Sequence, residues 1–202
     1  MISKKLAKAI NDQINAEMWS AYLYLSMSQD IYAKGYKGIA HWFKVQFLEE
    51  QAHAAIMINY LHSQDERVIL APIAKVQTQW KTVLAAFEDT LKHEKEVTAM
   101  INNLCDIADE DKDRAAANFL AWFIDEQVEE EENARDLIAQ CKMIGDNMGG
   151  MVMLDKELGV YGAEGAQHPH ERRPRWTTRI SPAPCCRRPC SRGWRRRRWR
   201  AF

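Results

Sequence analysis

The stretch FKVQFLEEQAHAAIMINYL, residues 43 to 61, is an apolar helical pattern with acids and a histidine in its middle. Glu50 and His53 are three residues apart, so a helix presents both side chains on one face, one turn apart. Burying an unpaired carboxylate is costly, and a helix that only filled a core would carry leucine at these positions. The stretch therefore predicts a core helix with a polar site set into its buried face.

Glycine and proline are almost absent from residues 1 to 144, which favours long helices separated by short breaks. The pattern predicts helices at roughly 4–33, 39–65, 77–108 and 113–143, with a short fifth at about 150–160. Short turns make the first and second helices, and the third and fourth, antiparallel neighbours. The segment DERVILAPIAKVQ between helices two and three is long enough to run the length of a bundle. We therefore expect an all-α four-helix bundle with one long crossover.

Each predicted helix carries an apolar seam with alternating spacings of three and four residues. Acids, an amide and the histidine interrupt these seams near their middles: Glu17 on the first helix, Glu50 and His53 on the second, Glu94 on the third, Gln127 and Glu130 on the fourth. One such acid alone would indicate a buried side chain satisfied by a neighbour. Four of them without a lysine or arginine on any seam would repel one another, and bound cations would remove that repulsion. Mostly oxygen ligands with an imidazole suit iron better than a thiolate-binding metal.

Other candidate ligands are weaker. Cys105 and Cys141 lie in helical patterns and are expected to be small core residues, and no Cys-x-x-Cys pair indicates a zinc or rubredoxin-like site. The histidines at 41, 62 and 93 fall off the seams and are expected at the surface. The turn DIADEDKDR is either a solvated loop or a segment that attracts cations toward a pore.

The net charge of zero conceals two different polypeptides. Residues 1–165 carry 16 Lys and Arg against 27 Asp and Glu, whereas residues 166–202 carry 12 Arg and one acid, Glu171. We therefore expect a folded domain at 1–165 and an Arg-rich disordered tail at 166–202. The tail is either the product of a shifted reading frame or a basic arm, which would contact nucleic acid through its Arg and Trp residues, neutralise an acidic interior or dock on a membrane surface.

The sequence resembles the ferritins, most closely the bacterial non-haem ferritins, over about residues 1 to 163. The resemblance rests on NAEMWSAYLY, FLEEQAHA, KHEK, DEQVEEE and DKELG, which follow in the family's order. It implies a ferritin-like bundle that assembles into a hollow 24-subunit shell. Such a shell oxidises Fe(II) with O2 or H2O2 and stores the ferric mineral inside.

The resemblance also implies roles for single residues. Glu17, Glu50 and His53 would hold the first iron of a di-iron ferroxidase centre, and Glu50, Glu94 and Glu130 the second. Gln127 would lie in the same pocket, and Tyr24 would be a neighbouring hydrogen-bond donor or electron source. Glu49, Glu126 and Glu129, sharing Glu130, would form a third, lumen-facing iron site.

Haem is not expected. The haem-bearing bacterioferritins have Met directly after the Glu of the second-helix motif, and this chain has Gln51 there. They also carry a second Glu-x-x-His on the fourth helix, where this chain has Gln127 and Glu130.

The start of the chain lacks a signal-like apolar run, and no later run is long and uncharged enough to span a bilayer. We therefore expect a cytoplasmic homo-oligomer without membrane contact. Two other functions stay open: a DNA-associated protein that acts through the tail, and a structural bundle without metal.

Overall fold

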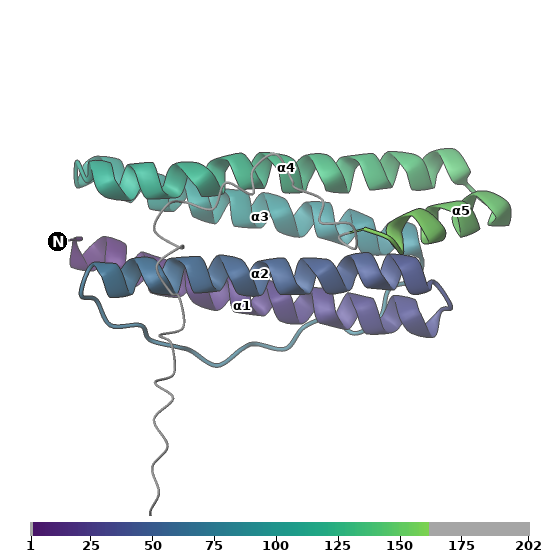
Figure 1. Ribbon diagram of the computed structural model, residues 1–202, viewed down its shortest axis with the longest axis horizontal. Coiled ribbons are helices and arrows are strands. Elements are labelled where there is room, and N and C mark those ends of the chain that lie inside the picture. Colours follow the sequence, from purple (N-terminus) through teal and green to yellow (C-terminus); the bar gives the residue numbers. More distant parts are fainter. Residues whose placement is uncertain (1, 162–202) are drawn as a thin grey trace, which may run out of the picture. The chain divides into compact units, whose positions relative to one another are not determined.

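The computed structural model describes residues 2–161, which form five α-helices and no strand (Figure 1). The helices are α1 (Lys4–Ala33), α2 (Lys37–Ser63), α3 (Val83–Glu110), α4 (Arg114–Ile144) and α5 (Met148–Leu158). The all-α bundle, the long crossover and the short fifth helix are confirmed. The predictions for the tail lie outside the described residues.

The helix starts follow from local capping. Ser3 accepts a hydrogen bond from the Leu6 N–H and Asp113 from two N–H groups of α4, which satisfies amides that have no partner inside their helices. Thr82 does the same for α3 by accepting from the Ala85 N–H. The prediction that the third helix starts near residue 77 is therefore wrong, because the chain stays extended up to this cap.

The crossover between α2 and α3 runs along α1 (Figure 1). Polar side chains of α1 hold its backbone in place. Asn11 accepts from the Ile69 N–H at 2.6 Å and Asn15 from the Ala71 N–H at 2.6 Å, while Asp30 accepts from the Trp80 N–H at 2.9 Å. These contacts explain why a segment with so few internal hydrogen bonds keeps one path.

Two apolar cores fill the two ends of the bundle. One joins the start of α1 and α4 to the ends of α2 and α3, and includes Ile10 and Leu120. The other joins the opposite ends of the four long helices to α5, and includes Phe43 and Phe87. Between these cores the long helices place a layer of buried polar side chains: Glu17, Glu50, His53, Glu94, Gln127 and Glu130. We call this set the middle layer.

The short helix α5 packs mainly against α2 (Figure 1). The start of α2 has no side-chain cap of its own, and Asp155 of α5 supplies one. Its Oδ1 accepts from the Gly38 and Ile39 N–H groups at 2.8 and 2.9 Å. Gly38 permits this approach, since a Cβ atom there would lie 1.6 Å from the Asp155 carbonyl oxygen.

Among residues 2–161, no helix has the length and apolar character needed to cross a membrane.

Candidate metal centre

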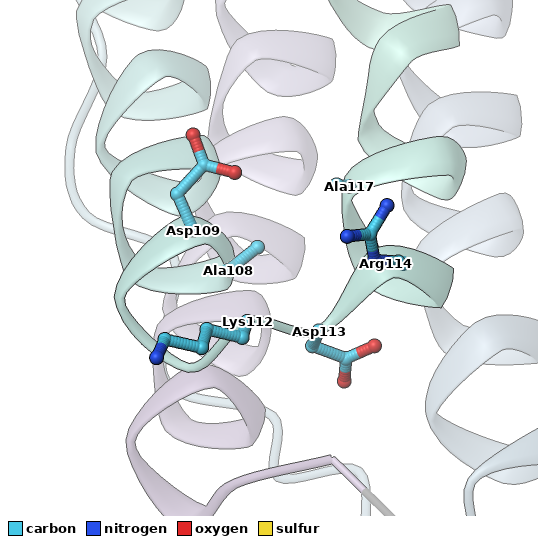
Figure 2. Close-up of a pocket in the computed structure, with 6 residues that line it drawn as sticks. All are labelled: Ala108, Asp109, Lys112, Asp113, Arg114 and Ala117. Atoms are coloured by element: carbon cyan, nitrogen blue, oxygen red, sulfur yellow. The ribbon is translucent and has the colours of Figure 1, made fainter.

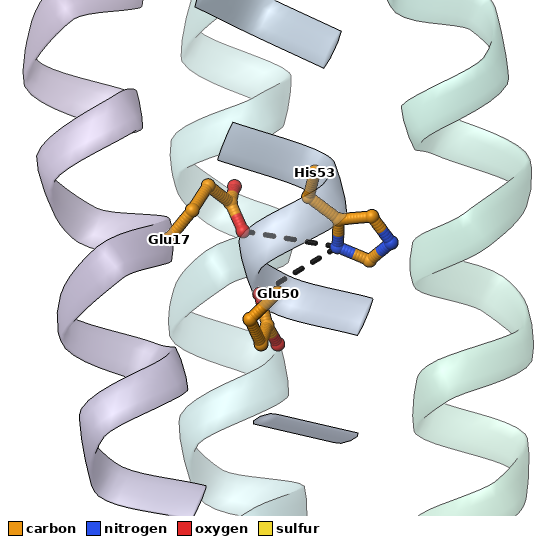
Figure 3. Close-up of side chains that lie close together, drawn as sticks. All are labelled: Glu17, Glu50 and His53. Atoms are coloured by element: carbon orange, nitrogen blue, oxygen red, sulfur yellow. Dashed lines mark ion pairs between the residues drawn. The ribbon is translucent and has the colours of Figure 1, made fainter. Parts of the chain in front are cut away.

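Three side chains of the middle layer form a compact group (Figure 3). Glu17 of α1, Glu50 and His53 of α2 each offer a ligand atom, and these atoms all lie within 4.8 Å of one another. His53 Nδ1 is 3.5 Å from Glu50 Oε2 and 3.9 Å from Glu17 Oε2. The helical spacing predicted that Glu50 and His53 share a face, and the structure adds the neighbouring helix that brings Glu17 to them.

Glu94 of α3 is held from two other helices. The Tyr24 hydroxyl donates to its Oε1, and the Gln127 amide donates to its Oε2 at 3.1 Å. Gln127 also donates to the Glu94 carbonyl oxygen at 3.3 Å. Glu94 is 1% exposed, so these donors fix a carboxylate that has almost no access to water.

The fourth acid of the layer, Glu130, is buried on α4. Burial raises its pKa well above the ordinary value, and Glu94, Glu49 and Glu50 raise it further. The structure therefore places all four predicted carboxylates in one buried layer, although only Glu17, Glu50 and His53 form a ligand-distance group within residues 2–161.

The electrostatics of the layer favour a bound cation. Burial raises the pKa of Glu17, with a further contribution from Glu50, and burial also raises the pKa of Glu94. No lysine or arginine in the described part of the chain forms an ion pair with Glu17, Glu50, Glu94 or Glu130. His53 is the basic side chain beside Glu17 and Glu50, and divalent cations would replace the protons that the raised pKa values hold in this layer.

Two buried oxygens without a hydrogen bond also favour a bound cation. Glu50 Oε2 and Gln46 Oε1 are buried and accept no hydrogen bond from residues 2–161. An unsatisfied buried oxygen is expensive, whereas a metal ion or its bound water would satisfy it. The donor set, which consists of carboxylates, an imidazole and an amide, fits iron.

The histidine makes a contact on its other side. Burial lowers the pKa of His53, but Glu126, Glu50 and Glu17 outweigh this and raise it well above the ordinary value. His53 Nε2 lies 3.7 Å from Glu126 Oε1. Nδ1 thus faces the acids of the group while Nε2 faces Glu126, and contacts on both nitrogens fix the orientation of the ring.

The residues predicted for a third iron site lie beside the middle layer. Glu49, Glu126 and Glu129 are half-buried, and the Gln46 amide donates to Glu49 Oε2. Of these acids, Glu126 contacts His53. The residues predicted for the third iron site therefore lie directly beside the histidine, which the sequence did not indicate.

The sequence also missed several neighbours. His93 was predicted at the surface, and this is wrong: it is 7% exposed, and its Nε2 lies 2.8 Å from the Ser20 hydroxyl. Gln13 is 4% exposed and donates to Glu17 Oε1 at 2.7 Å. His62 is exposed as expected, and His41 is half-buried.

The turn between α3 and α4 lines a hollow of about 460 Å³. Figure 2 shows Asp109 of α3 and Arg114 of α4 on opposite sides of it. Lys112 and Arg114 accompany Asp109 and Asp113 around the hollow, so its lining has as many cations as acids. Both expectations for this turn, a solvated loop and a segment that attracts cations, therefore stay predictions.

Known proteins are similar to this chain in sequence and fold. A model of the ferritin-like domain matches residues 7–144. A bacterial non-heme ferritin of Bacteroides fragilis is 43% identical over 159 residues, which cover 79% of this chain and 99% of that protein. A bacterial non-heme ferritin of Staphylococcus aureus is 36% identical over 160 residues, covering 79% and 96%.

Solved structures agree with these matches. An open pore ferritin from the archaeon Archaeoglobus fulgidus aligns with a TM-score of 0.78 at 42% identity, covering 79% of this chain and 99% of that chain. A humanized archaeal ferritin aligns with the same TM-score and identity, covering 97% of its own chain. Since sequence and fold agree across the helical bundle, the chain belongs to the ferritin family.

Proposed function

We propose that this protein stores iron and oxidises Fe(II) with O2 or H2O2 at a di-iron ferroxidase centre in the middle layer. The observation that carries the proposal is the group of buried carboxylates and one histidine, with which no lysine or arginine of residues 2–161 pairs. The ferritin relatives support the choice of iron as the substrate.

In this proposal two Fe(II) ions bind side by side. Glu17, Glu50 and His53 hold the first ion, and Glu50, Glu94 and Glu130 hold the second. Carboxylates whose pKa is raised give up their protons when the ions bind, so binding replaces protons with iron.

The chain's own residues position these ligands. Gln13 orients Glu17, while Tyr24 and Gln127 orient Glu94. Two Fe(II) ions supply two electrons, which reduce O2 to H2O2 or H2O2 to water, with protons taken up from the site and solvent. The apolar cores on both sides of the layer limit the access of water to the reacting ions.

Three further statements belong to the same proposal. Glu49, Glu126 and Glu129, with Glu130, form a third iron site beside the di-iron centre. The chain assembles into a shell of 24 subunits that holds the ferric mineral. The shell works in the cytoplasm and carries no haem.

The proposal is tested by replacing Glu50 and His53 together with Ala and following Fe(II) oxidation by stopped-flow absorbance. We expect rapid oxidation to be lost while the oligomer keeps its size in solution. The matched control replaces His62 and Glu132, an exposed histidine and an exposed glutamate, and should oxidise iron at the wild-type rate. A double variant that oxidised Fe(II) as fast as wild type would refute the assignment.

A second candidate function depends on the tail alone. Residues 166–202 carry 12 Arg with interspersed Trp, a composition suited to phosphates and bases. Salt-sensitive DNA retention that disappears when residues 166–202 are removed would support it. The shortened chain should still oxidise Fe(II) fully, because every proposed ligand precedes residue 131.

A further inference from the structure

A row of four aromatic rings leads from the middle layer to the C-terminal end of α5. Tyr24, whose hydroxyl donates to Glu94, stacks on Phe43 with ring centroids 6.4 Å apart. Phe43 contacts Trp42 edge to face at 5.1 Å, and Trp42 lies 6.3 Å from Tyr161. Each ring therefore contacts the next over the whole distance.

The far end of the row lies beside α2. Tyr161 lies three residues beyond the end of α5, and its carbonyl oxygen lies 3.0 Å from His41 Nε2. The contact of Asp155 with the start of α2 fixes α5 beside Trp42, which is 2% exposed. These contacts place the backbone of Tyr161 and the helix α5 beside α2.

The environment of Tyr161 is acidic. Burial raises the pKa of its phenol, and the neighbouring carboxylates raise it further: Glu49, Glu130, Glu129 and Glu126. The phenol is thus protonated and lies in the electrostatic field of the same acids that we propose for the third iron site. Such a group can pass its proton to a nearby carboxylate when it loses an electron.

We propose that Trp42 and Tyr161, with Tyr24 and Phe43, form an electron relay between the C-terminal end of α5 and the middle layer. The relay rests on the proposed ferroxidase function, which supplies its oxidant. Tryptophan and tyrosine are the protein side chains that most readily lose one electron, apart from thiols. Phe43 is not oxidised, and it bridges the space between Tyr24 and Trp42.

The relay acts when H2O2 meets a single Fe(II) ion. H2O2 needs two electrons and two protons to become two water molecules, and one Fe(II) ion supplies one electron. Tyr24 supplies the second and passes its proton to Glu94, after which Trp42 reduces Tyr24 and the proton returns. Tyr161 then reduces Trp42 and gives its own proton to the neighbouring carboxylates.

In sum, one electron passes from Tyr161 to the middle layer while its proton stays on a neighbouring carboxylate, and solvent supplies both protons that convert H2O2 into two water molecules. Tyr161 becomes a neutral phenoxyl radical. An Fe(II) ion among Glu49, Glu126 and Glu129 restores it by giving one electron, and the proton returns from a carboxylate. The oxidising equivalent therefore leaves the buried layer before it damages the ligands.

The step between Trp42 and Tyr161 is tested in the full iron-free chain by laser photoionisation of tryptophan. Transient absorption follows the decay of tryptophanyl radicals and the growth of tyrosyl radicals. We expect Tyr161→Phe and Trp42→Phe each to remove the same fast phase of tyrosyl growth. Tyr60→Phe and Trp80→Phe are matched controls, since Tyr60 stacks on Phe119 in the other core and Trp80 bonds to Asp89.

Tyr161→Phe deletes only a hydroxyl of a half-buried side chain, so it keeps the test open if Trp42→Phe fails to fold. Tyrosyl growth in Tyr161→Phe that matched wild type would overturn the relay. This measurement contains no iron, so its outcome does not depend on the ferroxidase proposal.

Electron transfer from Tyr161 to the middle layer is tested by freeze-quench EPR of the full-length protein mixed with one Fe(II) per chain and H2O2. We expect Tyr161→Phe to lose at least half of the tyrosyl signal and to show a tryptophanyl signal that Trp42→Phe removes. Identical spectra for wild type and Tyr161→Phe would show that Tyr161 does not pass an electron to the middle layer. Absence of Fe(II) oxidation by the wild-type protein would instead overturn the proposed function.

Discussion

Glu126 touches two parts of the site, because its carboxylate faces His53 Nε2 at 3.7 Å while its neighbours belong to the proposed third iron site. If it orients His53, Glu126→Gln should slow oxidation of the first two Fe(II) ions per chain by roughly 10-fold. Stopped-flow absorbance measures this rate.

The control for Glu126 is Glu132→Gln, an exposed acid on the same helix. A variant at Glu126 that changed the number of bound iron ions but left the initial rate intact would limit this residue to the third site.

The pH dependence of the iron-free protein follows from its raised pKa values. Glu17, Glu94 and Glu130 hold protons more tightly when folded, so their contribution to stability is full below about pH 4.5 and is lost as the pH rises toward their folded pKa values. The raised pKa of His53 acts in the same direction, with its contribution lost above its ordinary value of 6.5.

Glu130→Gln should therefore stabilise the iron-free protein at pH 8, on the order of 1–3 kcal/mol, and leave it nearly unchanged near pH 5. Urea unfolding at the two pH values measures the difference. An equal effect at both values would contradict the raised pKa of Glu130.

At this scale the sequence predicted the buried acids well and their neighbours poorly. Glu17, Glu50, Glu94 and Glu130 interrupt apolar seams, and an acid on a seam has few alternatives to burial. His93 could not be recognised, since its partner Ser20 lies on another helix. Gln13 lies one turn before Glu17 on the same helix, a spacing that could have indicated their hydrogen bond.

One side chain of α5, Asp155, hydrogen-bonds the start of α2. Asp155→Ala removes the acceptor for two N–H groups at the start of α2, and we expect a loss of about 1 kcal/mol in the free energy of unfolding. Glu157→Ala, an exposed substitution on the same helix, is the control. Thermal or urea unfolding that showed equal losses in both variants would mean that this cap does not hold α5.

The helix pattern predicted all five elements because their apolar periodicity is long and only briefly broken. It failed at the start of α3, where residues 77–82 have a composition that a helix would also accept. Contacts with residues distant in the sequence set the path there, such as the hydrogen bond that Asp30 accepts from the Trp80 N–H. A local sequence pattern cannot predict such contacts.

For the whole molecule, the layered arrangement explains why the site needs the complete bundle. Each long helix contributes part of the middle layer, and the apolar cores on either side hold the helices in register. Within one chain of zero net charge, residues 1–165 are acidic and residues 166–202 are basic. The predicted boundary between them remains a prediction.

The central claim is that the middle layer binds two iron ions. Anomalous scattering at the iron edge, measured on crystals of the full-length protein soaked in Fe(II), tests it directly. We predict two strong peaks, one among Glu17, Glu50 and His53 and one among Glu50, Glu94 and Glu130. Iron peaks elsewhere on the chain with none in this layer would contradict the account.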